Sequence, residues 1–489
     1  MGGVVMGTAL TTFIGFLSIC LNNVIILKQF GMVASFALFV NPLITCLITP
    51  VYLKLWPYNF RKKKEDARPV SNPTQRAIEW LASFISLNKK IILSLAIILT
   101  LIIGGFSFRV KLENNSVSMF KEKASVLHRL NSLTNDFPGV QTFFIRINGG
   151  HKDIFKDPKN LREIDAVQTW LDQSGKYDKT VSIIDFLKLI NREMNGGNPE
   201  KEKLPSTKAR IAQYLTFLED NDIERYVNYD FSDINIMVRH NINSSHDQKY
   251  ALKDLAREIK TILNPHFSFF ITGDGILTLN GADAIADGQA KSIFLLLFII
   301  FIIMSGLFMN LKAGLLSLVP NIIPVVINFG IMGLFSIPLN VGTAMVSVIA
   351  IGIAVDDTLH FMTRYNDEMH QVKNQDKAMR ICIRTELKVV FATSIALSLG
   401  FAVLAFSNFV PIIQFGMLSA VVMLVAFLCD IFVTPILLSN TRLLTLWDIL
   451  SLKLRKEVIE QSEFFRDMKM RQIKKIVLLA RIRKQKKDD

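Results

Sequence analysis

The sequence is poor in cysteine, with four in 489 residues. Three of them lie in apolar runs and one in a basic stretch, and the polar segment 107–290 has none. Their spacing fits neither a disulfide framework nor a metal site. We therefore expect the polar segment to fold without disulfide bridges and without a bound metal.

The motifs of several enzyme classes are also missing. The chain has no phosphate-binding loop, no nucleophile elbow and no zinc-binding helix. We therefore predict that it is not an enzyme and needs no cofactor. Without a nucleotide site, any active transport would run on an ion gradient.

Apolar residues make up 50% of the chain, too many for an ordinary soluble protein. A bilayer crossing needs about 20 consecutive apolar residues, and eight runs approach or exceed this length. The amino terminus lacks the charged region of a signal peptide, so we interpret its apolar run as a membrane helix as well. The eight predicted spans are 3–22, 30–53, 90–108, 292–310, 314–336, 341–363, 388–407 and 411–438.

The net charge of +14 comes mainly from three short basic segments. Lys and Arg exceed Asp and Glu in segments 54–90, 364–388 and 441–489, which all flank apolar runs. Segment 107–290 is close to neutral. This distribution is typical of cytoplasmic loops and not of a nucleic-acid surface, and it predicts that 107–290 lies on the opposite side of the membrane.

An internal repeat joins the two ends of the chain. Residues 6–53 align without a gap on 391–438, and both copies contain Gln-Phe-Gly-Met, at 29–32 and 414–417. We interpret the protein as a duplicated unit of one helix, one large extramembrane domain and five helices. The first copy is then present only as its last two helices, and the chain is the carboxy-terminal part of a twelve-helix protein.

The polar segment is predicted to be an α+β domain. Its β-branched and aromatic runs predict strands at 141–147, 233–239 and 267–272, and helical spacing predicts helices at 161–171, 208–218 and 248–263. A helix from about Ile276 is expected to continue into the membrane at Ser292, which would couple domain movement to the bundle. Asn-Gly-Gly-Asn-Pro at 195–199 predicts a loop.

The predicted organisation follows from these features. The expected segments are two helices at 1–53, a basic linker at 54–89, one helix at 90–108, the α+β domain at 109–290, a five-helix bundle at 291–440 and a basic tail at 441–489. The tail is either an amphipathic helix on the membrane surface or a solvated basic segment. The fold class is thus a polytopic α-helical membrane protein with one extramembrane α+β domain.

Two adjacent acids, Asp356 and Asp357, interrupt the span 341–363. A carboxylate at membrane depth costs about 2.5 to 3.5 kcal/mol, so intramembrane acids are functional by default. Small residues earlier in the span, such as Gly352, would let another helix approach closely and dry the site. We predict that the pair handles protons. The alternative is a hydrogen-bond cluster that only stabilises the bundle.

Other polar residues are candidates for the same site. His360 follows the acids by one helical turn and is a candidate relay, a partner of the acids, or an interfacial residue. Asn321 lies between two prolines and is a candidate to face the acids, and Thr393 is a candidate to complete a relay or to bond to its own helix. The acid Asp430 has no role in this hypothesis.

The Gly-x-x-x-Asp-Asp-x-x-His-Phe pattern at 352–361 carries a family resemblance, together with Pro-Asn-Ile-Ile-Pro at 320–324 and Gln-Phe-Gly at 414–416. The chain resembles the second half of RND-superfamily transporters of the MMPL-like, hydrophobe-exporting branch. The resemblance implies proton-driven export of lipids or other hydrophobic compounds across a bacterial inner membrane, with the external domain as a porter domain.

In this resemblance Asp356 and Asp357 match the proton-coupling acids, and Thr393 matches a polar partner on the neighbouring helix. The first four helices and the first porter domain of the family are not in the sequence. The resemblance therefore implies a partner, either a separately encoded amino-terminal half or a periplasmic accessory protein. Two alternatives are a non-transporting remnant that binds lipid or a partner, and a SecD/SecF-like or sterol-sensing protein.

Overall fold

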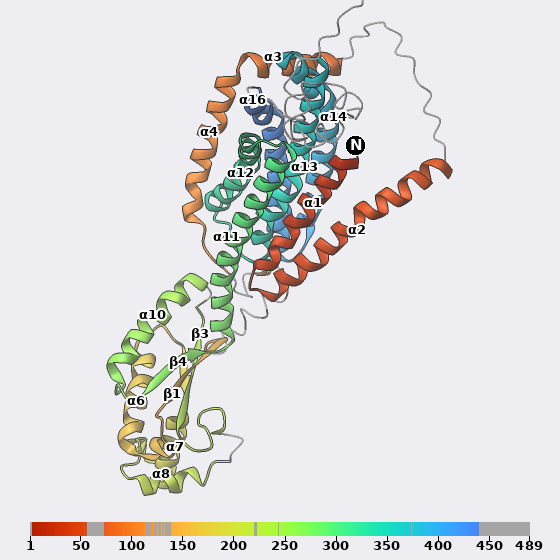
Figure 1. The fold of residues 1–489 in the computed structure, drawn as a ribbon. Coiled ribbons are helices and arrows are strands. Elements are labelled where there is room, and N and C mark those ends of the chain that lie inside the picture. The colour runs from red at the N-terminus through yellow and green to blue at the C-terminus, as the bar shows by residue number, and fades with distance from the viewer. Residues whose placement is uncertain are drawn as a thin grey trace, which may run out of the picture.

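The computed structural model describes residues 2–55, 73–113, 119–121, 138–219, 223–242, 244–372 and 374–439, and the single residues 125, 129 and 132. A helical bundle and a smaller α+β domain lie one beyond the other along the long axis of the molecule (Figure 1). The predicted tail at 441–489 and residues 56–72 of the predicted linker lie outside the described residues.

The bundle is built from long apolar helices. Seven helices in the described part of the chain are long and apolar enough to cross a membrane, and they correspond to the last seven of the eight predicted spans. The first predicted span is a shorter helix of 17 residues, followed by a 3-10 turn at Ile19–Leu21. The bundle helices are α1 (Gly2–Ser18), α2 (Ile25–Leu55), α4 (Lys89–Gly105), α11 (Asp274–Leu307), α12 (Leu311–Leu334), α13 (Val341–Val372), α14 (Gln375–Ala402) and α15 (Val410–Leu428).

Helix α15 is followed directly by a π-helical turn, Cys429–Val433, and by the short helix α16 (Thr434–Leu438). Helix α13 ends later than its predicted span, and helix α14 begins earlier than its predicted span. In both helices polar residues continue the helix past the apolar run. Helix α12 runs unbroken through Pro320 and Pro324, as membrane helices tolerate when neighbouring groups satisfy the freed carbonyls.

A further helix lies in the segment predicted as a linker. Helix α3 (Pro73–Leu87) crosses the end of the bundle farthest from the α+β domain (Figure 1). It buries Ile78, Ala82 and Ile85, which share one face at helical spacing. Its apolar stripe is too narrow for a membrane span, so a search for continuous apolar runs does not find it.

The α+β domain contains a four-stranded sheet in the order β2-β3-β1-β4, with every neighbouring pair antiparallel. The three predicted strands are confirmed, and the additional strand, β2, has only three residues. The order and the repeated strand-helix-strand units are those of ferredoxin-like folds. The strands are β1 (Gln141–Asn148), β2 (Lys179–Val181), β3 (Asp233–His240) and β4 (Ser268–Thr272).

Helices cover one face of this sheet. The inward side chains alternate along the strands, as in Phe143, Ile145 and Ile147 of β1, which are all buried. They pack in one apolar cluster with α6 (Pro158–Gln173), α7 (Ile183–Met194), α8 (Lys208–Leu215) and α10 (Ser245–Ile262). The predicted helices at 161–171, 208–218 and 248–263 are confirmed, with shifted ends.

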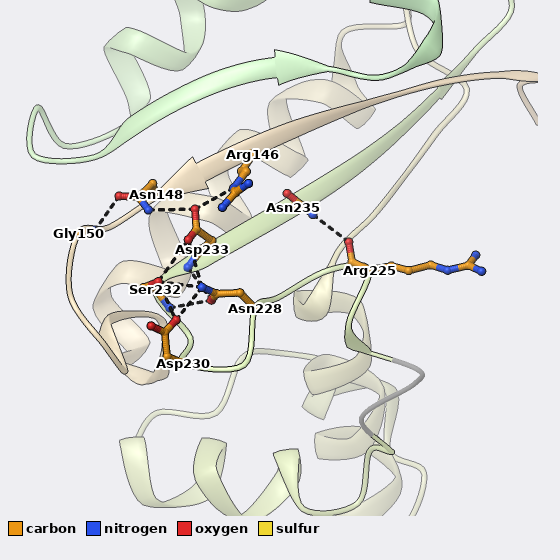
Figure 2. Close-up of polar contacts among 9 residues, drawn as sticks. All are labelled: Arg146, Asn148, Gly150, Arg225, Asn228, Asp230, Ser232, Asp233 and Asn235. Atoms are coloured by element: carbon orange, nitrogen blue, oxygen red, sulfur yellow. Dashed lines mark hydrogen bonds and ion pairs between the residues drawn. The ribbon is translucent and has the colours of Figure 1, made fainter.

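A polar network fastens the loop before β3 to β1 (Figure 2). Asp233 accepts hydrogen bonds from Arg146 Nε and Asn148 Nδ2, both at 2.9 Å, and from Asn228 Nδ2 at 3.1 Å. Burial alone would raise the pKa of Asp233, but the hydrogen bonds from Arg146, Asn148 and Ser232 and the charge of Arg146 lower it below its ordinary value. Ionised Asp233 therefore stabilises this end of the sheet.

Helix α11 joins the domain to the bundle. Strand β4 ends at Thr272, and Gly273, with φ of 129°, turns the chain directly into α11. A Cβ at Gly273 would lie 3.0 Å from the Phe143 Cα, so the backbones approach closely here. The predicted helix that continues into the membrane is confirmed, and it begins at Asp274.

The two copies of the internal repeat have the same construction. In each copy a glycine of the second helix, Gly31 or Gly416, packs against the carbonyl oxygen of Phe16 or Phe401 on the first helix. Each first helix ends in a 3-10 turn. The phenylalanine pairs that also repeat are Phe16–Phe30 and Phe401–Phe415, with ring centroids 6.3 and 5.8 Å apart.

Candidate functional site

Helix α1, from the first repeat, packs directly on α13, which carries the two acids. A Cβ added to Gly15 would lie 3.1 Å from the Gly352 Cα. The small residues of α13 thus admit another helix, as the sequence predicts. Gly352 lies one helical turn before Asp356, so this close approach brings α1 to the acids.

Asp356 is bound by two threonines of α1. Thr12 Oγ1 donates to Asp356 Oδ2 at 2.8 Å, and Thr11 Oγ1 lies 3.2 Å from Asp356 Oδ1. Each threonine also has a carbonyl of its own helix within reach, such as Thr8 O, 2.9 Å from Thr12 Oγ1. A hydroxyl has one hydrogen to donate, so it serves either the carboxylate or the carbonyl.

This arrangement has two hydrogen-bonding states. Ionised Asp356 only accepts, and it draws the Thr12 hydrogen away from the Thr8 carbonyl. Protonated Asp356 can donate to Thr12 Oγ1 instead, and the Thr12 hydrogen then returns to Thr8. The protonation state of one acid therefore determines the hydrogen bonds between α1 and α13.

Asp357 faces a different side of α13. It lines a small cavity together with Glu386 of α14 and Asp430 of the π-helical turn. The cavity has a volume of about 10 Å³ for the centre of a water, which is space for roughly one molecule. The adjacent acids therefore have separate surroundings, which adjacent helical positions require because they point about 100° apart.

His360 is exposed on α13, one helical turn after the acids, and no hydrogen bond joins it to either acid among the described residues. Thr393 does not contact the acids. Thr393 is exposed on α14, and its hydroxyl bonds to Val389 O and Val390 O of its own helix. Beyond the acids, Arg364 forms an ion pair with Glu368 at 2.9 Å.

The two asparagines of α12 are buried, but their recorded hydrogen bonds go elsewhere. Asn321 Nδ2 donates to Ser317 O at 2.8 Å within α12. Asn328 Nδ2 donates to Ser347 Oγ of α13 at 3.1 Å, nine residues before Asp356. Asn321 thus bonds within its own helix, and Asn328 joins α12 to α13. Among the described residues, neither asparagine forms a hydrogen bond with the acids.

The sequence prediction missed three residues of this site. Thr11, Thr12 and Glu386 contact or face the acids, and none of them was a candidate. The sequence pattern that could have indicated the two threonines is Thr8, Thr11 and Thr12, which share one face of a helix within an apolar run. Among the described residues no group of three or more His, Cys, Asp or Glu is placed to hold a metal ion.

A family model adds an independent observation. The model described as the MMPL family matches residues 163–447, which is more than half of the chain. The chain belongs to the MMPL family. The match includes α13 and its acids, the cavity and most of the α+β domain. The resemblance stated from the motif is therefore confirmed.

Individual relatives of this MMPL protein are distant. A membrane protein of Methanocaldococcus jannaschii is 23% identical over 331 residues, which are 66% of this chain and 83% of the relative. The hedgehog release protein Disp from the water bear Hypsibius dujardini has a similar structure, with a TM-score of 0.59 and 14% identity. That alignment covers 90% of this chain and 58% of Disp.

The SecDF structure in its Super-membrane-facing form aligns with a TM-score of 0.46 and 13% identity, over 89% of this chain and 48% of SecDF. The likeness to Disp shows that the fold is shared, and this MMPL chain spans less than two thirds of that longer protein. Family and fold together support a multi-pass membrane transporter.

Proposed function

We propose that this MMPL protein forms part of a transporter that exports lipids or other hydrophobic compounds, driven by the proton motive force across a bacterial inner membrane. The observation that carries the proposal is the hydrogen-bonded contact of Asp356 with Thr11 and Thr12. This contact joins α1 of the first repeat to α13 of the second, so protonation of Asp356 can change the hydrogen bonds between these two helices.

The mechanism follows from the two hydrogen-bonding states. Proton binding at Asp356 replaces a charge-assisted hydrogen bond from α1 by a neutral one, which is weaker. A proton taken from one side of the membrane and released to the other would alternate the contact between α1 and α13. Helix α11 also packs on both helices and carries this change to the external domain.

Further helices complete the transporter in this proposal. Gly400 of α14 is the repeat equivalent of Gly15, and a Cβ there would meet nothing within 4 Å. By the internal symmetry, a helix like α13 would pack on this face of α14. It would also cover His360 and Thr393, and it would come from an amino-terminal half, encoded in the same or a separate chain.

The remaining parts of the proposal follow from charge and composition. The basic segments lie in the cytoplasm and the α+β domain lies outside, beside the substrate route, as a porter domain. A periplasmic accessory protein is a second candidate partner. The protein performs no enzymatic reaction and needs no cofactor.

The test is export by the transporter assembled from this chain and an amino-terminal half. Asp357→Asn and Asp356→Asn should each abolish proton-driven export while the protein still inserts into the membrane. Asp376→Asn is the matched control, because Asp376 lies at the start of α14 and is 74% exposed. Export that persists in both intramembrane variants would contradict the proposal and favour a chain that only binds lipid or a partner.

A further inference from the structure

A third acid, Asp430, is buried in the bundle with 3% of its surface exposed. It lies in the π-helical turn Cys429–Val433, which interrupts the helical course from α15 to α16. Such turns within α-helices are rare and frequently occur at functional sites. The turn shifts the helix phase at the point where Asp430 faces α13.

Two hydroxyls hold one oxygen of this acid. Thr358 Oγ1 donates to Asp430 Oδ1 at 2.7 Å, and Thr434 Oγ1 lies 3.2 Å from the same oxygen. Thr358 directly follows Asp357 in α13. The carboxyl group of Asp430 is thus fixed in orientation beside the acid pair.

The first copy of the internal repeat has the same helix pair without this acid. The equivalent of Asp430 in the first copy is Thr45, which is exposed. The Thr45 hydroxyl donates to Asn41 O at 2.9 Å within its own helix. Helix α2 continues through this position without a π-helical turn. Of the two equivalent helix pairs, only the second, whose helix α15 packs against α13, has both the acid and the turn.

Asp430 and Asp357 share the small cavity described above. Glu386, which is half-buried, also lines this cavity. The rest of the wall is apolar and consists of Phe361, Ile383, Leu387, Val390 and Ile431. A water in this space would have carboxyl groups as its polar neighbours and no competing amide or hydroxyl from the lining side chains.

We propose that Asp430 exchanges a proton with Asp357 through one water in this cavity, an inference that rests on the proposed function. The Asp357 carboxyl group donates its proton to the water, and the water donates another of its hydrogens to the Asp430 carboxylate. Glu386, which lines the same cavity, also interacts with the charge of Arg364 on α13.

Asp356 does not belong to this pathway. Its two oxygens are bound by Thr11 and Thr12 of α1, and it does not line the cavity. The adjacent acids therefore have different tasks. Asp356 changes the contact between repeats, and Asp357 exchanges protons with Asp430.

The test measures coupling between the two acids directly, in the purified chain in lipid nanodiscs. Dicyclohexylcarbodiimide labels protonated carboxyl groups in apolar surroundings, and peptide mass spectrometry reports the labelling of Asp357 as a function of pH. Asp430→Asn should move the midpoint of Asp357 labelling by about one pH unit, as expected for coupled carboxyl groups. The control Asp376→Asn should leave it in place.

Two further variants keep the proposal testable if Asp430→Asn does not fold. Thr358→Val removes the shorter hydrogen bond and should change the same midpoint while Asp430 remains. Asp430→Glu should restore the wild-type pH profile in part. An unchanged Asp357 midpoint in a folded Asp430→Asn or Thr358→Val protein would overturn the proposal.

Proton movement into proteoliposomes that hold the assembled transporter separates this inference from the proposed function. If Asp357→Asn stops proton movement but Asp430→Asn changes neither movement nor labelling, only the role of Asp430 is wrong. If the two acids are coupled in labelling but Asp357→Asn leaves proton movement intact, the proposed function is wrong, and the route through Asp430 with it.

Discussion

Gly15 of α1 and Gly352 of α13 meet backbone to backbone, one helical turn from Asp356. The contact joins residues 337 positions apart in the sequence, and it sets the distance at which Thr12 reaches the acid. Because no side chain separates the helices here, the contact between Thr12 and Asp356 depends on Gly15 and Gly352, which have no side chain of their own.

Gly15→Val should therefore separate α1 from α13. Overpacking of this kind costs about 1 to 3 kcal/mol, and the thermal midpoint in detergent should fall. Gly400→Val is the matched control, because Gly400 is the repeat equivalent of Gly15 and a Cβ there would have nothing within 4 Å. It should leave this chain stable but weaken its association with an amino-terminal half. Equal loss of stability in both variants would contradict the asymmetry between the two copies.

Thr12→Val should free Asp356 from its shorter hydrogen bond while it keeps the shape of the side chain. Hydrogen bonds between membrane helices contribute roughly 0.6 to 1.7 kcal/mol, so we expect a modest loss of stability. Carbodiimide labelling of Asp356 should rise. Thr393→Val is the control, because the Thr393 hydroxyl bonds only within α14; a larger effect there than at Thr12 would contradict the described site.

Asp233→Asn should weaken the end of the sheet, and the loss should depend on pH. Loss of hydrogen bonds to a charged group costs about 1.5 to 3 kcal/mol. The pKa of Asp233 is lowered from its ordinary value of 3.8, so its contribution is present above pH 3.8 and is lost as the pH falls through the lower folded-state pKa.

Hydrogen exchange of the β3 amides measures this difference. Wild type and Asp233→Asn should differ most near neutral pH and converge below pH 3.8. Asp247→Asn, at an exposed carboxylate on α10, is the control and should have little effect. A difference that does not change with pH would show that the ionised form of Asp233 is not what stabilises the network.

Cysteine labelling should establish the orientation in the membrane. In a chain without its four native cysteines, Glu200→Cys in the external domain should react with an impermeant maleimide in intact cells. Asp376→Cys at the start of α14 should react only after the membrane is opened. The opposite result would reverse the orientation proposed from the basic segments.

The sequence was sufficient to predict the membrane spans and three of the four strands, because continuous apolar runs and local strand patterns can be recognised without the tertiary structure. The strands at 141–147 and 233–239 are rich in β-branched and aromatic residues, which favour strands. Helix α3 and strand β2 were missed since their patterns are too short or too polar to stand out. The start of α14 at Gln375 was also missed, because a helix can continue through polar residues once the membrane ends.

The site was predictable only in part. Asp356 and Asp357 stand out because a charge in lipid has an energetic cost wherever it occurs in the chain. Thr12 and Glu386 do not stand out, since their importance comes from α1 and α14 packing against α13. Thr393 was expected to meet the acids by resemblance, but its side of α14 is exposed in this chain.

Helix α11 has a mechanical consequence. It spans 34 residues without a break, or about 50 Å at the usual rise per residue. Its membrane half packs beside α1 and α13, and its other end begins directly at the sheet (Figure 1). A tilt of about 5° at the bundle would swing the far end by about 4 Å over that length. A helix of this length can therefore act as a lever that turns a small tilt beside the acids into a displacement of several ångströms at the sheet.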